Sequence, residues 1–219
     1  MTREELLKVA KPILFNTEMV QAILEGRKTV TRRAIKLDLG LADMDKTDNS
    51  YLKIPDEYGD YHDAKDLCRH RVGDILYVRE TFRYVSIGEV TYEGECIWQE
   101  DVIQFKASEE EFDEEYELFI GEYEKWKPSI HMPKDIARIF LKVIDVRVER
   151  LQDITVSDIL REGIREIKGL KHVFHKITEH KNEFKTLWNS TVKEQELSRY
   201  GWESNPFVWV IEFERVIPK

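Results

Sequence analysis

A lysine and a threonine that could carry out covalent chemistry stand three residues apart in the segment GRKTVTRR. A threonine hydroxyl is a poor nucleophile until a base removes its proton, and a lysine amine can be that base if its pKa is lowered. Burial and neighbouring cations both lower a lysine pKa. The neighbouring cations here are Arg27, Arg32 and Arg33. Lys28 and Thr31 are therefore candidate catalytic residues, and the alternative is that this basic run is a solvated strand end.

The spacing of this pair sets a condition on the backbone. In a regular strand, side chains three residues apart point to opposite faces. Lys28 and Thr31 can therefore act together only if a turn or bulge interrupts the strand at Thr29 and Val30.

A glutamate at the end of a predicted helix is the third candidate. Thr155 can cap a helix that begins in ITVSDILREGI, Asp158 follows three residues later, and Gly163 ends it. Glu162 then lies in the last turn, where the negative end of the helix dipole raises the pKa of a carboxyl group. A raised pKa suits a group that holds or passes a proton. The alternative is an ordinary surface glutamate.

Another glutamate interrupts the apolar side of a predicted strand in VGDILYVRETFR. Leu76, Val78 and Phe82 share one side of this strand, and Glu80 falls on that same side. A carboxylate on an apolar face requires a partner. The sequence predicts a buried salt bridge from Glu80 to an arginine of the TRR segment, with contact to a ligand as the alternative.

Two further residues are candidates for contact with a ligand, and metal binding is not expected. His131 lies in the segment PSIHMP, which its prolines make rigid, and Trp126 precedes it. Cys68 and His70 are close in sequence, with His62 nearby, but the chain has no CxxC pair and no HExxH helix. The sequence therefore predicts no metal and no cofactor.

The composition is that of a globular protein with an acidic balance. The chain has 219 residues, 42% hydrophobic and 35% charged, and a formal net charge of −9. Net acidity argues against broad binding to duplex DNA, which needs a large basic face. No segment is long and apolar enough to span a membrane or to serve as a signal peptide, so we expect a cytoplasmic protein. Two cysteines fit a reducing compartment.

The pattern of elements predicts an α+β fold. After a polar leader, residues 11–15 are predicted as a strand and residues 17–24 as a helix that Asn16 or Thr17 caps and Gly26 ends. Further strands are expected within 84–106, over 138–151 and at the end of the chain, with another helix over 171–188. Short helices between strands favour a sheet that curls into a small barrel. We expect one domain, 1–219, with insertions near 38–72, 84–125 and 165–200, and a solvated acidic segment at 109–124.

Four separated segments resemble the ASCH domain family of the PUA-like superfamily. They are ILEGRKTVTRR, GDILYVRE, the segment from ARIFLKVIDVRVERLQDIT to ILREGI, and the closing NPFVWVIEFE, and together they cover about half of the chain. The chain is similar to the long ASCH proteins that phages and prophages commonly encode. The resemblance implies a PUA-like small β-barrel with flanking short helices, whose cleft binds a nucleoside or RNA.

One ASCH subgroup consists of amidohydrolases that remove the acetyl group of N4-acetylcytidine. Its triad pattern falls on Lys28, Thr31 and Glu162 of this sequence. The resemblance implies that Thr31 attacks the acyl carbon, that Lys28 accepts its proton and stabilises the oxyanion, and that Glu162 orients Lys28 or shuttles a proton to the leaving amine. The expected ligand contacts are Arg27, Arg32, Arg33, Glu80, Trp126 and His131. Two alternatives stay open: a noncatalytic RNA-binding module and a ribonuclease.

Overall fold

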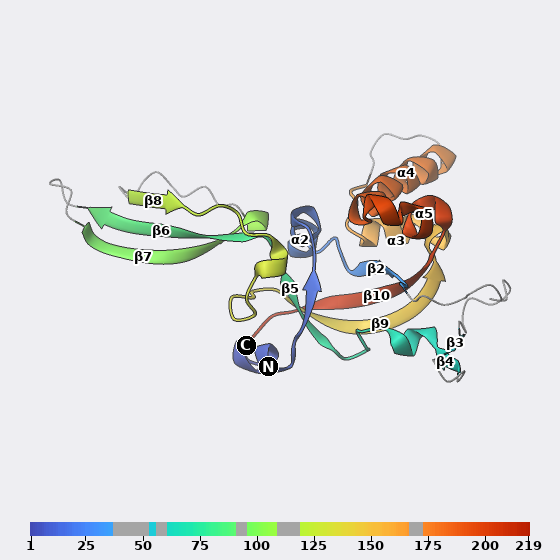
Figure 1. Cartoon of the computed structure of the whole chain (residues 1–219), viewed down its shortest axis with the longest axis horizontal. Coiled ribbons are helices and arrows are strands. Elements are labelled where there is room, and N and C mark those ends of the chain that lie inside the picture. Colours follow the sequence, from blue (N-terminus) through green and yellow to red (C-terminus); the bar gives the residue numbers. More distant parts are fainter. Residues whose placement is uncertain (37–52, 56–60, 91–95, 109–118, 167–172) are drawn as a thin grey trace. The chain divides into compact units, whose positions relative to one another are not determined.

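The computed structural model describes residues 1–36, 53–55, 61–90, 96–108, 119–166 and 173–219 (Figure 1). The chain divides into two compact units. Unit 1 comprises Met1–Leu24, Ile75–Leu141 and Val216–Lys219, and unit 2 comprises Glu25–Asp74 and Lys142–Arg215. Each unit is therefore assembled from segments that are distant in the sequence.

The fold is α+β, as the sequence predicts. The largest sheet has five strands in the order β1-β5-β9-β10-β2. It is mixed, because β1 and β5 are parallel whereas β10 and β2 are antiparallel. Within the described residues this sheet has two edge strands, β1 and β2, and the strands do not close into a barrel.

Unit 2 consists of strands and helices packed around an apolar core. Its helices and strands are β2 (Val30–Ala34), β3 (Lys53–Pro55), β4 (Tyr61–Asp63), α3 (Val156–Arg161), α4 (Val173–Thr191), α5 (Leu197–Tyr200), and all but the ends of β9 (Phe140–Arg150) and β10 (Phe207–Val216) that belong to unit 1. Val30 and Val210 of the strands pack with Ile159 of α3 and with Phe184 and Trp188 of α4. The apolar residues that alternate along the strands thus pack against the apolar face of α4. Ile159 packs in the same core, and this fixes the position of α3.

Helix α3 positions Glu162, and its ends form as the sequence predicts. The Thr155 hydroxyl accepts a hydrogen bond from the Asp158 N–H (3.1 Å), which caps the first turn. Gly163 has φ of +102°, a conformation that glycine adopts without the steric cost of a side chain. Glu162 is therefore the C-cap residue of this helix.

The remaining described segments, with the N-terminal helix α1, form unit 1. Its elements are α1 (Arg3–Val9), β1 (Lys11–Leu14), α2 (Thr17–Leu24), β5 (Ile75–Arg79), β6 (Phe82–Val90), β7 (Cys96–Phe105) and β8 (Phe119–Tyr123). The predicted helix at 17–24 is confirmed, and the Asn16 side chain accepts from the Met19 N–H (2.8 Å). The polar-leader prediction is wrong, because residues 3–9 form a helix with a capping box between Thr2 and Glu5.

The predicted hairpin, long strand and closing strand are also confirmed. Strands β6 and β7 pair antiparallel, and β8 lies on the other side of β6. The predicted strand at 138–151 is β9, and the closing strand is β10. The acidic segment predicted as solvated lies outside the described residues over 109–118. Within the described part of the chain, no helix has the length and apolar character needed to cross a membrane.

Candidate functional site

The backbone around Lys28 joins α3 to the edge of the sheet in unit 2. Gly26, with φ of +75°, ends the preceding turn, and the chain then runs beside the end of α3, where Lys28 and Glu162 form an isolated antiparallel bridge. The Thr29 N–H donates to the Arg161 carbonyl (2.9 Å), while the Thr29 carbonyl accepts from the Phe213 N–H (2.9 Å).

The two backbone groups of Thr29 thus bond to different neighbouring segments. In a regular antiparallel strand, the N–H and C=O of one residue bond to the same neighbouring strand. The backbone therefore departs from regular strand geometry at Thr29, one of the two positions where the sequence requires an interruption. Regular pairing with β10 begins at Val30, which lies opposite Glu212.

Lys28 and Glu162 form a buried ion pair. The Lys28 Nζ donates to Glu162 Oε2 (2.7 Å), to the Glu162 carbonyl (2.9 Å) and to the Val30 carbonyl (2.9 Å). These three acceptors match the three N–H donors of an ammonium group, and none of them is the Thr31 hydroxyl. The Lys28 side chain is fully buried, and that of Glu162 is 4% exposed.

Burial gives Lys28 an unusual acid–base character. Removal from water disfavours the ammonium form and lowers the pKa of Lys28, an effect that the Glu162 carboxylate opposes. The positive charges of Arg32 and Arg33 lower this pKa further. Lys28 is thus a lysine whose neutral form is made more accessible by its surroundings, as a general base requires.

Arg32 joins this pair through a fully buried guanidinium group. Its Nη1 donates to Glu162 Oε1 (3.2 Å), and its Nη2 lies 3.0 Å from Glu149 Oε2 and 3.3 Å from Asp158 Oδ2. We call Lys28, Arg32, Glu149, Asp158 and Glu162 the buried charge cluster. The sequence predicts that Arg32 contacts a ligand. Its terminal nitrogens instead bond to the protein's own carboxylates.

A second layer of charge surrounds the buried charge cluster. Arg147 of β9 forms ion pairs with Glu149 and Glu212, and Arg161 of α3 pairs with Glu212 (2.6 Å). Asp145 also pairs with Arg147 (3.2 Å). Most of the positive charge around Lys28 is therefore neutralised within unit 2.

Replacement of Glu212 with Gln should reduce the acid sensitivity of the folded protein. Hydrogen bonds from Arg161, and then from Arg147, hold the Glu212 pKa below its ordinary value of 4.5. A carboxyl group with a lowered pKa in the folded state stabilises the fold above its ordinary pKa, and this contribution is lost as pH falls through the lowered value. Urea denaturation between pH 6 and pH 3 should show a shallower loss of stability for Glu212→Gln than for wild type. An unchanged pH dependence would contradict this prediction.

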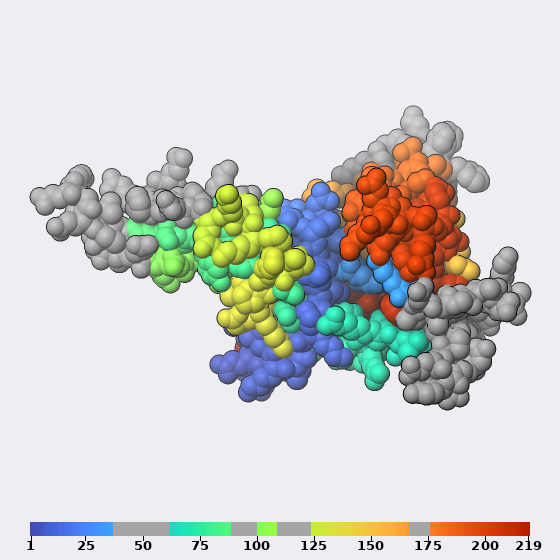
Figure 2. All heavy atoms as spheres, in the orientation of Figure 1, coloured from blue at the N-terminus to red at the C-terminus, as the bar shows by residue number. Residues whose placement is uncertain are grey.

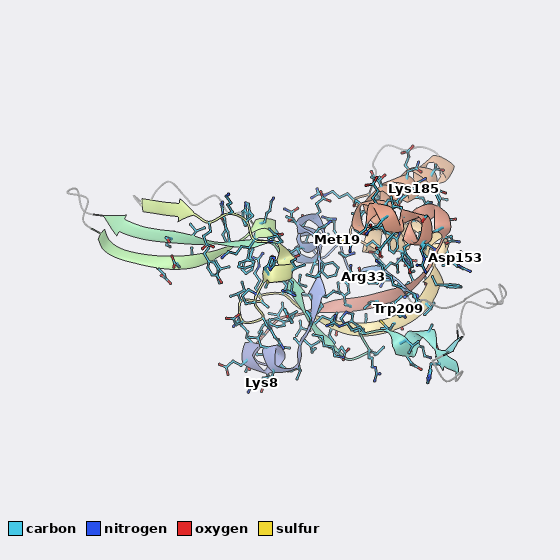
Figure 3. All side chains as sticks on the ribbon, in the orientation of Figure 1. Lys8, Met19, Arg33, Asp153, Lys185 and Trp209 are labelled. Atoms are coloured by element: carbon cyan, nitrogen blue, oxygen red, sulfur yellow. The ribbon has the colours of Figure 1, made fainter. Side chains whose placement is uncertain are left out.

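The other candidates in unit 2 occupy separate places. Thr31 is buried and alternates with Arg32 along β2, so the two side chains point to opposite faces. Arg33 lies on the same face as Thr31, opposite Trp209 of β10 (Figure 3), and burial lowers its pKa whereas Glu162 raises it. Arg27 bonds to the Glu25 carboxylate (2.6 Å) and to the Gly163 carbonyl. The space-filling view shows β2 reaching the surface beside α4 and α5 (Figure 2).

Three predicted ligand contacts belong to unit 1. Glu80 is buried and forms the predicted type of salt bridge, but its partner is Arg138 and not an arginine of the TRR segment. The distances are 3.0 Å from Nε to Oε1 and 2.8 Å from Nη2 to Oε2. Trp126 is half-buried with the Arg83 guanidinium carbon 4.3 Å from its ring centroid, and His131 is exposed in a single-turn helix.

Sequence reasoning missed the carboxylates that bind Arg32 and the arginines outside them. The pattern DVRVER places Asp145, Arg147 and Glu149 on one side of β9, and Asp158 lies one helical turn before Glu162. These spacings could have indicated a layer of charged side chains between β9 and α3. In the described residues, no group of three or more His, Cys, Asp or Glu side chains is arranged to hold a metal ion.

Comparison with known proteins gives no relative from which a role for these residues could be read. No family model, curated protein or solved structure matches the chain.

Proposed function

We propose that the chain is an ASCH-type amidohydrolase, with a PUA-like fold, that removes the acyl group from N4-acylated cytidine. The observation that carries this proposal is the buried contact between Lys28 Nζ and Glu162 Oε2, two residues 134 positions apart in the sequence. A buried lysine with a lowered pKa is costly to maintain and is typical of a site that moves protons. The role of Thr31 rests on the resemblance to the ASCH amidohydrolases, since its side chain lies on the face of β2 opposite Arg32.

The chemistry of this proposal has two steps. In the first, the Thr31 Oγ bonds to the acyl carbon and its proton passes to the neutral Lys28 amine. The carbon–nitrogen bond then breaks, and the departing N4 amine takes up that proton, either from Lys28 or through Glu162. In the second, water attacks the threonine ester, and acetate leaves as Thr31 recovers its proton. The Lys28 ammonium stabilises the oxyanion that forms in each step.

The charges around the site support a neutral substrate. The terminal nitrogens of Arg32 bond to carboxylates, and Arg147 and Arg161 have carboxylate partners of their own. A phosphate group brought to this site would find these cations already paired with carboxylates and would gain little from them. This favours an acylated nucleoside over an RNA strand held by its phosphates.

The first test measures acetate released from N4-acetylcytidine by wild type, Lys28→Met and Lys28→Arg. Wild type should turn over, and both variants should lose activity by at least about a hundredfold, which is the scale of general-base catalysis. Arginine keeps the positive charge but stays protonated, so it cannot serve as the base. Activity retained in Lys28→Arg would exclude a base role for Lys28. A folded wild type that releases no acetate would overturn the proposed function.

A further inference from the structure

Arg32 and Lys28 divide the two oxygens of one carboxylate between them. Arg32 Nη1 bonds to Glu162 Oε1, and Lys28 Nζ bonds to Glu162 Oε2. This arrangement fixes the rotation of the carboxylate, because each oxygen has its own cationic donor. A change at Arg32 would therefore reach Lys28 through Glu162, without a direct contact between the two cations.

The guanidinium of Arg32 is itself held in place from β9 and α3. Its Nη2 meets Glu149 Oε2 of β9 and Asp158 Oδ2 of α3, and the side chain is fully buried. A charge held in this way acts on its neighbours with little screening by solvent. Its position is thus set by the fold, before any ligand binds.

We propose that Arg32 is a positioning residue that holds the Glu162 carboxylate and shares its negative charge with Lys28, so that Lys28 can take part in proton transfer. The catalytic part of this inference rests on the proposed function, but the effect on the Lys28 proton does not. This positioning role takes the place of the contact with a ligand that the sequence predicts for Arg32.

The direction of the effect follows from the charges that face the pair. Arg33 of β2 and Arg32 both disfavour the ammonium form of Lys28, and Glu162 favours it. The other charged groups around them are Glu149 and Arg147 of β9, Asp158 and Arg161 of α3, and Glu212 of β10.

Loss of the Arg32 charge makes the Lys28 ammonium more stable for two reasons. One repelling cation disappears, and the three carboxylates that it neutralised become stronger sources of negative potential. Both changes raise the pKa of Lys28 and reduce the fraction that is neutral at a given pH. A purely structural role for Arg32 would instead lower activity by the same factor at every pH.

The decisive experiment compares Arg32→Gln with Arg147→Gln. Arg147 is a matched control because it is also an arginine bonded to Glu149, but it contacts neither Lys28 nor Glu162. For Arg32→Gln, we expect the acidic limb of the kcat/KM profile to move up by at least about one pH unit. On the acidic limb this is at least a tenfold loss that is recovered at high pH, since one pKa unit is a tenfold change in neutral fraction. Arg147→Gln should move the limb by much less, because Arg147 contacts neither Lys28 nor Glu162. A loss for Arg32→Gln that is equal at all pH values would overturn the proposal.

A second measurement does not depend on activity. Lysine side-chain NMR can follow the Lys28 signal through a pH titration of wild type, Arg32→Gln and Arg32→Lys. The midpoint should rise in Arg32→Gln and lie nearer to wild type in Arg32→Lys, which keeps the charge. Equal midpoints in the three folded proteins would overturn the role of Arg32. Shifted midpoints together with no hydrolysis by wild type would overturn the proposed function alone.

Discussion

Replacement of Thr31 with Ala is expected to reduce release of acetate from N4-acetylcytidine by at least about a thousandfold, the scale seen when an enzyme loses its nucleophile. The reason is that no acyl–enzyme ester can form without the hydroxyl. Thr31→Ser should keep a large part of the activity, because serine offers the same Oγ. The loss should appear in kcat, since the backbone that a substrate meets is little changed.

A neighbouring threonine gives the control for Thr31. Thr29 precedes it by two residues, and its hydroxyl accepts from Arg161 Nε (3.3 Å). Thr29→Ala should retain activity within about tenfold, because this change removes only one long hydrogen bond at the edge of the site. Mass spectrometry of rapidly quenched wild type should find an acetyl group on Thr31. Full activity in Thr31→Ala would exclude Thr31 as the nucleophile. Direct attack by water would then be the mechanism.

Replacement of Glu162 with Ala is expected to destabilise the protein by about 3–5 kcal/mol, the usual cost of removing one partner from a buried ion pair. Both Lys28 and Arg32 lose a carboxylate in this variant, and Lys28 keeps the carbonyls of Val30 and residue 162 as acceptors. Urea denaturation at pH 7 measures the change. The double variant Lys28→Met with Glu162→Ala should be more stable than Glu162→Ala alone, because it no longer buries an ammonium group that has lost its carboxylate.

An exposed ion pair gives the matched control for Glu162. Lys185 bonds to Glu203, whose side chain is 76% exposed. Removing this glutamate should leave the unfolding midpoint almost unchanged, since solvent weakens exposed pairs. A Glu162→Ala variant as stable as the control would mean that the Lys28–Glu162 contact contributes nothing to the fold.

The local elements of this fold were predictable because short-range chemistry determines them. Thr155, Asp158 and Gly163 mark both ends of α3, and this alone placed Glu162 at its C-terminus. The N-terminal helix was predictable by the same rule, since Thr2 and Glu5 form a capping box. It was missed because its few apolar residues looked like a leader.

The partners of the buried charges were not predictable from sequence alone. Charged side chains carry no signal that selects one opposite charge among many, so the sequence could require a partner for Glu80 but not choose Arg138. The same holds for Arg32. A basic residue in a basic run looks solvated, and only the arrangement of β9 and α3 shows that three carboxylates surround it.

The contact between Lys28 and Glu162 also bears on the order of events during folding. Synthesis runs from the N-terminus, so more than a hundred residues are added after Lys28 and Arg32 before their carboxylate partners are all present. These partners are Glu149, Asp158 and Glu162. Closing so long a loop is entropically costly and is favoured only once the strands and α3 pack together. We expect this region to acquire protection from hydrogen exchange among the last parts of unit 2. Lys28 and Glu162 would then stay apart until the surrounding structure is complete.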